Sequence, residues 1–400
     1  MIELTTIYAD NAATTAVSRT AVDAMLPYLT DFYGNPSSLH HVGQDAAQAL
    51  QKAREDVSRC LNCSPQEVIF TSCGSEADNQ AIRSAAALGE VKGKRHIIST
   101  AFEHHAVLHT LKALERRGFE VELLDVHGDG RVTAQQVREA IRPDTCLVTV
   151  MFANNEIGTI QPIKEIGAVC REAGVLFHTD AVQAAGHLAI DVKAQNIDML
   201  SLSAHKFHGP KGVGVLYAKK GIRLTPLIEG GSQEQNRRAG TENIAGIVGT
   251  AAALTEACAN IEKNSEYVSA LRDRLIDGLL AIPHTILNGS RESRLPGNIN
   301  VCFEGIEGES LLLLLDEEGI CASSGSACTS GSLDPSHVLL AIGRPHEIAH
   351  GSLRLSLCEQ NTQEEINIIL AAVPRAIERL RAMSPIWRDQ KEGKKPYVIQ

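Results

Sequence analysis

The sequence predicts an open α/β fold with a mostly parallel, seven-stranded sheet flanked by helices, followed by a smaller α+β domain. Two observations support this prediction. Between about residues 68 and 217, short apolar segments alternate with longer amphipathic ones, which is typical of a parallel sheet that is buried on both faces. After about residue 281 the order of the segments becomes mixed, which indicates a second, smaller unit.

Each expected element follows from the local pattern. The seven strands are expected at residues 68–71, 96–100, 121–125, 146–151, 175–179, 199–203 and 213–217. Helical periodicity between them predicts helices at residues 76–88, 105–117, 133–141 and 163–173. A long helical region follows at residues 244–281, and Pro283 ends it. The smaller unit contains apolar segments at residues 297–303, 310–317 and 353–356 and a helix at residues 363–383.

These elements suggest two domains, for which 400 residues are ample. We expect a large ligand-binding domain at residues 15–260. A small domain would combine residues 1–14 with residues 261–384. Residues 385–400 are mostly polar, and we expect them to form a mobile tail.

Composition argues against several classes of function. The formal net charge of −10 argues against a nucleic-acid or membrane partner held by bulk electrostatics. No apolar run approaches the length of a membrane span, and no secretory signal is visible at the N-terminus, so we expect a cytoplasmic protein. Ten cysteines are too few for a disulfide scaffold in this chain. Cys60 and Cys63 have metal-like spacing, but no second such pair completes four ligands, so we expect no metal site.

Lys206 is the most informative residue. It follows the expected strand at residues 199–203 and precedes a glycine-rich turn into the next strand. A desolvated lysine amine readily forms a Schiff base, although most lysines lie on the surface. Asp180 ends another strand of the same sheet. Alone it would more often be a helix cap, but together with Lys206 it indicates an ionised aspartate that keeps the ring nitrogen of pyridoxal phosphate protonated.

Further polar residues follow other strands. Gly74 and Ser75 open a helix after a strand, which is either a phosphate site or a plain cap, and Ser203 and His205 flank the lysine and offer further donors. His104 follows the second strand, where an imidazole would stack on a ring or exchange protons, or be structural. Asn155 follows the fourth strand and offers an amide to a ring or a carboxylate.

Two more candidates lie in the smaller unit. Cys328 lies among small Ser and Gly residues at 321–332, where a thiol would be accessible to a substrate, unless it is incidental. Arg354 lies on an expected strand. Its guanidinium suits the bidentate binding of a carboxylate, and a structural ion pair is the alternative.

Together these segments resemble the NifS/IscS-type cysteine desulfurases, which are fold-type I pyridoxal phosphate enzymes of the class V aminotransferase family. The resemblance covers nearly the whole chain. The segments that carry it are residues 8–15, 34–38, 103–105, 153–159, 178–183, 203–206, 237–243 and 323–328. Residues 237–243 and the ending at residues 384–387 look more like NifS than IscS.

The resemblance implies a role for each matching residue. Lys206 would form the Schiff base with pyridoxal 5'-phosphate, Asp180 would pair with its ring nitrogen, and Gln183 with its phenolic oxygen. His104 would stack on the ring and take part in catalysis. The residues expected to hold the phosphate are Gly74, Ser75, Ser203, His205 and Thr241, the last from a neighbouring subunit. The residues expected to grip the substrate carboxylate are Arg354, Asn35 and Asn155. The family often has Thr where this chain has Ser75, which preserves the hydroxyl.

The implied reaction converts L-cysteine to L-alanine and leaves the sulfur on Cys328 as a persulfide for iron–sulfur cluster assembly. The implied partners are a second copy of the chain, forming a homodimer, and a U-type scaffold protein (NifU/IscU-like). No metal of its own is implied, although Cys328 has the chemistry to bridge to a cluster on a partner. The alternatives are another fold-type I reaction, such as transamination or selenocysteine lysis, and an assembly protein with vestigial cofactor chemistry.

Overall fold

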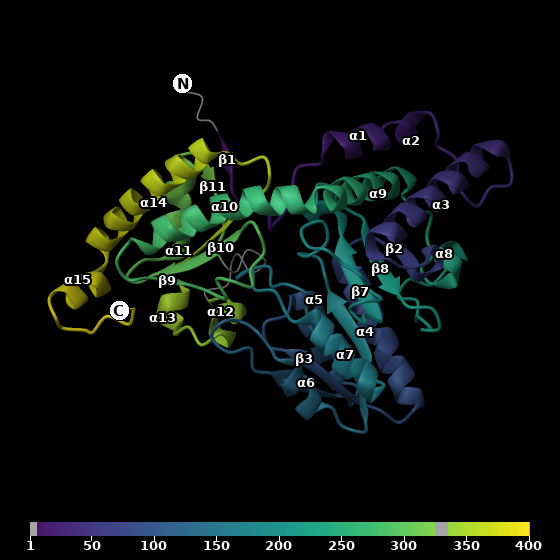
Figure 1. The fold of residues 1–400 in the computed structure, drawn as a ribbon, viewed down its shortest axis with the longest axis horizontal. Coiled ribbons are helices and arrows are strands. Elements are labelled where there is room, and N and C mark those ends of the chain that lie inside the picture. The colour runs from purple at the N-terminus through teal and green to yellow at the C-terminus, as the bar shows by residue number, and fades with distance from the viewer. Residues whose placement is uncertain (1–5, 325–334, 400) are drawn as a thin grey trace.

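The computed structural model describes residues 6–324 and 335–399. Figure 1 shows two groups of elements side by side, a larger one built around a twisted sheet and a smaller one that contains the C-terminus. Helices α9 (Ile244–Ala259) and α10 (Ile261–Leu280) run from the first group to the second.

The larger group contains the expected seven-stranded sheet. Its strands, in sheet order, are β2 (Val68–Thr71), β8 (Gly214–Ala218), β7 (Met199–Ser203), β6 (Leu176–Asp180), β5 (Thr145–Thr149), β3 (His96–Thr100) and β4 (Glu120–Leu124). Strand β8 is antiparallel to both of its neighbours, and the other neighbouring strands of this sheet pair in parallel. The predicted α/β class with a mostly parallel sheet is therefore confirmed.

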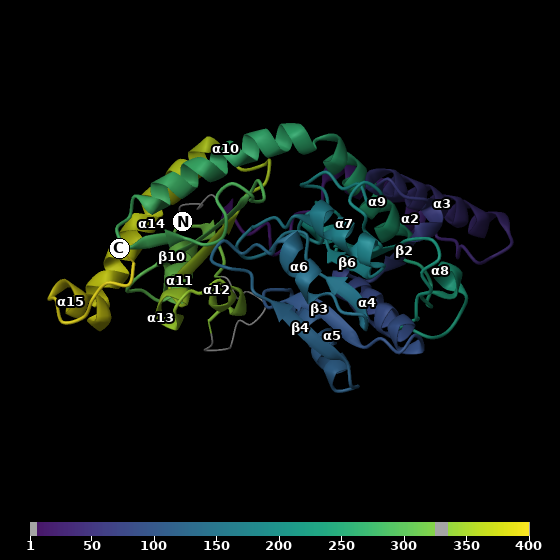
Figure 2. The same ribbon diagram turned by 60° about the horizontal axis from the view of Figure 1, so that its bottom comes forward.

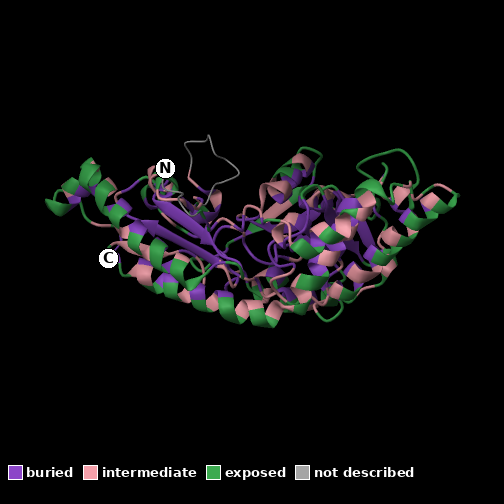
Figure 3. Ribbon diagram, turned by 90° about the horizontal axis from the view of Figure 1, so that it is seen from above, coloured by how far each residue is buried: buried purple, intermediate pink, exposed green. Residues whose placement is uncertain are grey.

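Helices cover this sheet at the predicted places. They are α4 (Gly74–Val91), α5 (His105–Glu115), α6 (Ala134–Ala140) and α7 (Ile163–Ala173). Figure 3 shows buried strands enclosed by helices whose outer faces are exposed. Because β3, β5 and β7 are buried along their whole length, a charged side chain near them is expected only where a partner or a cavity receives it.

The long helical region differs from its prediction because it breaks at Asn260. Helices α9 and α10 are bent by 72° there, and the Asn260 backbone is not helical. Its side-chain amide donates to the carbonyl of Glu256, the kind of local hydrogen bond by which Asn competes with a helix. No single helix among the described residues is long and apolar enough to cross a membrane; only this bent pair, taken together, passes that test.

The smaller group contains an antiparallel sheet in the order β12 (Ser352–Ser356), β10 (Asn298–Phe303) and β9 (Thr285–Leu287). Helices α10 and α14 (Gln363–Met383) pack against each other beside it (Figure 2), together with α11 (Gly308–Glu317). Strand β1 (Ile7–Tyr8) pairs with β11 (Ile320–Cys321), so the start of the chain packs with its last third. This pairing favours the expected division into domains, whose boundaries stay a prediction.

The remaining elements complete the two groups. They are the helices α1 (Arg19–Met25), α2 (Pro27–Thr30), α3 (His41–Leu61), α8 (Gln233–Asn236), α12 (His337–Ala341) and α13 (His346–Ala349), and the 3₁₀ turns η1 (Pro65–Glu67) and η2 (Ala204–Lys206). Helices α1 and α3 pack on α9.

The C-terminal segment differs from the mobile tail that we expected. It contains helix α15 (Pro385–Lys391), and both Trp387 and Ile399 are buried. The Arg381 guanidinium lies 4.0 Å from the Trp387 ring centroid, and the Glu304 carboxylate accepts hydrogen bonds from the Val398 and Ile399 amides. The segment is mostly polar, but these few contacts are enough to pack it against the smaller group.

Candidate active site

The ends of β6 and β7 and the start of α4 border a cavity of about 310 Å³. Most of the predicted site residues line it. They are Gly74, Ser75, His104, Asn155, Asp180, Gln183, Ser203, His205, Lys206 and Arg354. Because the carboxyl ends of parallel strands meet at one edge of a sheet, residues far apart in sequence converge there.

Lys206 is held by the N-terminal segment. It ends the 3₁₀ turn that follows β7, and its Nζ donates hydrogen bonds to the carbonyl oxygens of Ala12 at 2.6 Å and Ala13 at 2.7 Å. Gln183 Nε2 donates to the same Ala12 oxygen at 2.9 Å. The backbone after β1 therefore positions the amine, a contribution that sequence reasoning missed because carbonyl groups have no sequence signature.

Two buried carboxyl groups lie together in this cavity. Burial raises the pKa of Asp180 to about 6, while the Val182 amide, 2.9 Å from its Oδ1, and the Lys206 charge counteract that rise. Burial and the charge of Asp180 raise the pKa of Asp78 well above its usual range. Above about pH 6 Asp180 is therefore ionised, and burial beside that charge favours the neutral form of Asp78. Asp78 was not predicted, and its signal was a carboxylate one helical turn after Gly74, on the face of α4 that packs on the sheet.

His178 is the basic side chain that lies beside Asp78 in the described structure. Its Nε2 lies 3.6 Å from Asp78 Oδ1, but burial lowers the pKa of His178 to about 3. The imidazole is therefore neutral under physiological conditions. The one ionised carboxylate at the end of β6 is that of Asp180, as its predicted role requires.

The start of α4 has amides that suit an anion. The first amides of a helix have no carbonyl partner within that helix, and the capping sulfur of Cys73 accepts from Glu76 rather than from Gly74 or Ser75. A Cβ at Gly74 would lie 2.7 Å from Val182 Cγ2, so only glycine lets the chain approach the sheet this closely. The cap is therefore present, and it leaves the Gly74 and Ser75 amides for the predicted phosphate site, which stays a prediction.

His104 and His205 are neutral donors or acceptors in this site. Burial and the Lys206 charge lower the pKa of each imidazole to about 4. His104 caps α5, and its Nδ1 accepts a hydrogen bond from the Ala106 amide at 3.1 Å. The proton of the neutral ring therefore lies on Nε2, which remains available to the cavity.

Glu103 is a second buried group that the sequence reasoning missed. Burial raises its pKa to about 8. Its Oε1 accepts hydrogen bonds from the Thr100 hydroxyl and the Met151 amide, so it ties the end of β3 to the segment after β5. This role supports the position of His104, the next residue in the chain.

Arg354 serves as a structural ion pair and also lines the cavity. Its Nη2 lies 2.9 Å from Asp10 Oδ1, and its Nη1 donates to the carbonyl of Asn155 at 3.2 Å. The side chain is only 3% exposed, and within the described residues its buried Nε has no hydrogen-bond partner. A guanidinium with an unused donor beside a cavity suits an incoming carboxylate.

Two predicted residues of the described chain do not line this cavity. Asn35 is exposed, and its Oδ1 accepts from the Ser37 amide at 2.9 Å. Thr241 is exposed in the loop that precedes α9. Cys328 lies outside the described residues. The assignments of these three residues stay predictions.

The chemistry of the cavity fits pyridoxal phosphate. That molecule carries an aldehyde, a pyridine nitrogen and a phosphate. The cavity offers an amine at Lys206, an ionised carboxylate at Asp180, and helix amides at Gly74 and Ser75. Each group of the cofactor thus has a counterpart of the opposite chemical character in one cavity.

Comparison with known proteins gives a consistent result. Residues 7–369 match the aminotransferase class-V family. The chain is 56% identical to a protein named cysteine desulfurase IscS from Methanosarcina thermophila, over 95% of this chain and 94% of that protein. A solved NifS-like protein has a TM-score of 0.88 at 38% identity, covering 94% of this chain and 100% of that one. The structure titled SspA in complex with cysteine has a TM-score of 0.78 at 39% identity, covering 90% and 100%. The chain therefore belongs to the class-V aminotransferase family, among the IscS and NifS-like proteins.

Proposed function

We propose that this protein is a pyridoxal phosphate-dependent cysteine desulfurase, which converts L-cysteine to L-alanine and transfers the sulfur to Cys328. The observation that carries the proposal is the convergence of Lys206, Asp180 and Arg354 on one cavity at the start of α4. The names of the similar proteins, over nearly the full chain, support the same reaction.

The cofactor would be held by residues at three places in the cavity. The α4 amides, with Ser75, Ser203 and His205, would bind its phosphate, Asp180 its ring nitrogen and Gln183 its phenolic oxygen. When bound, pyridoxal phosphate would supply an electron sink for the charge left on the substrate Cα after deprotonation. An ionised Asp180 is the state that supports this chemistry, and its neighbour Asp78 is neutral and does not compete.

The protein residues would bind the substrate and move its protons. Arg354, with Asn155 beside it, would bind the carboxylate of L-cysteine. Lys206 Nζ would take the Cα proton and return it, acting as general base and then as general acid. The carbonyl groups of Ala12 and Ala13 keep the amine at the cavity, so the base is already oriented when the substrate binds.

Sulfur transfer completes the reaction. The Cys328 thiolate would attack the substrate sulfur, so that an S–S bond forms and the Cβ–S bond breaks. The electron pair of the broken bond stays on the carbon skeleton, which takes up protons and leaves as L-alanine. Cys328 then carries the persulfide, and a thiol acceptor or reductant would remove its outer sulfur.

The proposal extends to partners. Thr241 is exposed in the single chain, which supports its donation to the cavity of a second copy in a homodimer. Exposed apolar residues beside α1 and α2, namely Leu26, Leu29, Phe32 and Tyr33, are consistent with such a contact. We also propose delivery of sulfur to a U-type scaffold for iron–sulfur cluster assembly, and a cytosolic location.

The test measures sulfide and alanine released from L-cysteine and a reductant, with the visible spectrum of the cofactor recorded on the same samples. Wild type is expected to release both products in equal amounts. Cys328→Ala is expected to release neither while keeping its cofactor band, because the acceptor thiol is missing. Cys63→Ala, far from the cavity, is the matched control and is expected to behave as wild type. Undiminished release by Cys328→Ala would contradict the persulfide route and favour a lyase that needs no thiol.

A further inference from the structure

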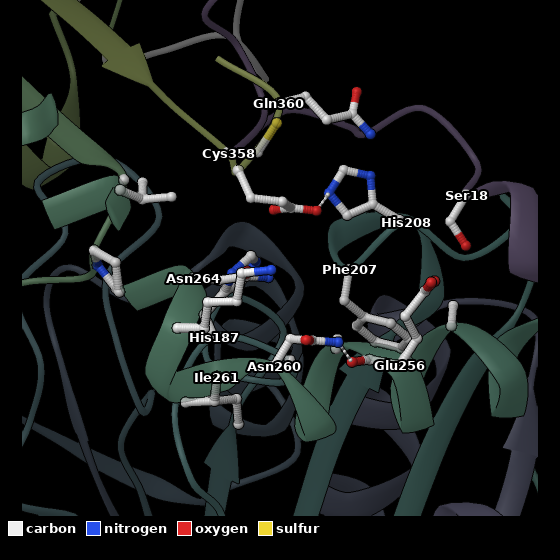
Figure 4. Close-up of a pocket in the computed structure, with 18 of the residues that line it drawn as sticks. Ser18, His187, Phe207, His208, Glu256, Asn260, Ile261, Asn264, Cys358 and Gln360 are labelled. Atoms are coloured by element: carbon white, nitrogen blue, oxygen red, sulfur yellow. Dashed lines mark hydrogen bonds and ion pairs between the residues drawn. The ribbon is translucent and has the colours of Figure 1, made fainter. Parts of the chain in front are cut away.

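A second cavity of about 510 Å³ lies beside the turn that carries Lys206. Lys206 lines the first cavity, whereas the next two residues, Phe207 and His208, line the second. Figure 4 shows His208, Cys358 and Gln360 around one end of this second cavity, with His187, Asn260 and Asn264 at the other. Nothing in the proposed desulfuration uses this space.

His208, Cys358 and Glu359 form a cluster at the edge of this cavity. Their nitrogen, sulfur and oxygen atoms all lie within 4.8 Å of one another, and within the described residues this is the one group of three or more such side chains that does so. His208 follows the 3₁₀ turn η2, whereas Cys358 and Glu359 follow β12. The cluster therefore joins two segments that lie about 150 residues apart in the sequence.

The environment of His208 orients its imidazole for a ligand. Its Nδ1 lies 2.9 Å from the carbonyl oxygen of Ala16, and since that oxygen only accepts, Nδ1 carries a proton. In the neutral ring the lone pair is therefore on Nε2, which lies 3.3 Å from Glu359 Oε1. This Nε2 is buried and makes no well-aligned hydrogen bond with the described residues. Metal-bound histidines usually have this arrangement, with the other ring nitrogen bonded to a carbonyl or carboxylate.

The backbone conformation of His208 also indicates that its side chain is held in a specific position. His208 has a φ of 62°, a left-handed conformation that costs free energy in a residue other than glycine and is found preferentially at functional sites. Its amide donates to the Thr15 hydroxyl at 2.8 Å. The N-terminal segment thus contacts both the backbone and the ring of His208 and keeps the imidazole aimed at Cys358 and Glu359.

We propose that His208 Nε2, the Cys358 thiolate and the Glu359 carboxylate bind a Zn²⁺ ion, whose fourth position faces the cavity. Nitrogen, sulfur and carboxylate ligands are the set that zinc prefers, and three protein ligands leave one position for water or an exogenous ligand. The ligand atoms would have to approach one another more closely than 4.8 Å. Since Glu359 is on the surface, its side chain can make that adjustment.

In the absence of metal, the His208 imidazole of this cluster binds a proton. Burial alone would lower the pKa of His208, but its contacts with Cys358 and Glu359 outweigh burial and raise it to about 10. Zinc would therefore displace the proton that His208 Nε2 carries in the metal-free protein. Zinc affinity should weaken as pH falls because protons compete for the same atoms.

Zinc at this place would connect the two halves of the active site. Cys358 lies four residues after Arg354 in sequence, and His208 lies two residues after Lys206. A bound ion would tie the segment that carries the amine to the segment that carries the guanidinium. Because the ion binds the folded chain, it should also raise the midpoint of thermal unfolding.

The experiment titrates zinc into metal-free holoenzyme in competition with a coloured chelator. The protein carries Cys328→Ser, so that this thiol does not contribute. We expect one Zn²⁺ per chain, and a thiolate-to-metal charge-transfer band when Co²⁺ replaces zinc. Loss of an outer-shell partner typically costs 10–100-fold in metal affinity, so Cys358→Ser and Glu359→Gln should each weaken binding at least about 100-fold.

A matched control is available in the same cavity. Glu256 lines it but lies outside the cluster and accepts from the Thr20 hydroxyl, so Glu256→Gln should bind zinc as the parent does. Glu359→Gln changes a surface side chain and is the variant least able to disturb folding. Wild-type zinc affinity in Glu359→Gln, or a Co²⁺ form without the charge-transfer band, would overturn the proposal. Both readouts are independent of desulfuration, so the failure of one proposal does not obscure the other.

Discussion

The two cavities beside the Lys206 turn differ in the partners of their polar side chains. In the first, the Lys206 amine donates to two backbone carbonyls, and the Asp180 carboxylate accepts a backbone amide. In the second, Nε2 of His208 faces the side chains of Cys358 and Glu359 without a well-aligned hydrogen bond to the described residues, while Nδ1 bonds to the Ala16 carbonyl. In the first cavity the charged side chains already have backbone partners that orient them for a cofactor and a substrate. In the second, three ligand atoms lie close together, and a proton or a metal ion can bind among them.

This difference shows what backbone contacts contribute. Backbone carbonyl and amide groups do not titrate, so the hydrogen-bond partners of Lys206 and Asp180 do not themselves change charge with pH. A site built from His, Cys and Glu side chains changes its charge with pH and with metal. The four residues from His205 to His208 line both cavities: His205 and Lys206 line the first, and Phe207 and His208 line the second.

The largest expected effect is a loss of desulfuration activity without a loss of zinc binding. Lys206→Ala removes the general base, so the rate of desulfuration should fall by about 10³-fold or more. Zinc binding by the same variant should stay within about 3-fold of wild type, because the Lys206 side chain lines the first cavity and is not one of the three ligands. Lys92→Ala, at an exposed lysine at the end of α4, is the control. Equal losses of activity and zinc affinity in Lys206→Ala would show that the cavities are one unit.

The second prediction concerns the two carboxyl groups of the first cavity. Asp180→Asn should lower kcat by about 10²-fold or more, because an amide cannot carry the charge that stabilises a protonated ring. Asp78→Asn should change kcat by less than about 10-fold, since a neutral amide replaces a carboxyl group that is already neutral. Steady-state kinetics on protein with matched cofactor content would measure both values. A larger loss for Asp78→Asn than for Asp180→Asn would reverse the assignment of charge.

The smallest expected effect concerns the pH dependence of stability in the second cavity. The pKa of His208 is raised to about 10, above the value of about 6.5 for an unfolded histidine. Its contribution to the unfolding free energy is therefore fully present below about pH 6.5 and is lost as pH rises towards 10. In metal-free protein, Glu359→Gln should lower Tm by about 1–3 °C near pH 6.5, and by less near pH 10.

This pH experiment also has an outcome that would contradict it. The groups that face His208 are Cys358, Glu359 and His187, and Glu359 is the one that the variant changes. A difference in Tm between wild type and Glu359→Gln that grows from pH 6.5 to pH 10 would show that His208 is not the proton carrier. The comparison of differences removes the titration of all other groups that the two proteins share.

Much of the sheet and of the first cavity could be predicted from local patterns. Strands at residues 68–71, 96–100 and 199–203 have the predicted bounds, because an apolar run between turn residues is a local signal. The placement of Asp180 and Lys206 at strand ends followed from the same signal. The break at Asn260 and the packing of Trp387 did not, because both depend on contacts with other parts of the chain.

The sequence by itself determined the fold class, the family and the residue types that the chemistry needs, because periodicity and motif spacing are local patterns that can be recognised without the structure. Only the tertiary structure decided that Asp180 is charged beside a neutral Asp78, that Ala12 and Ala13 hold Lys206, and that Cys358 lies beside His208. The physical reason is that desolvation and hydrogen bonding depend on neighbours in space. Those neighbours come from distant segments and are set when the chain packs.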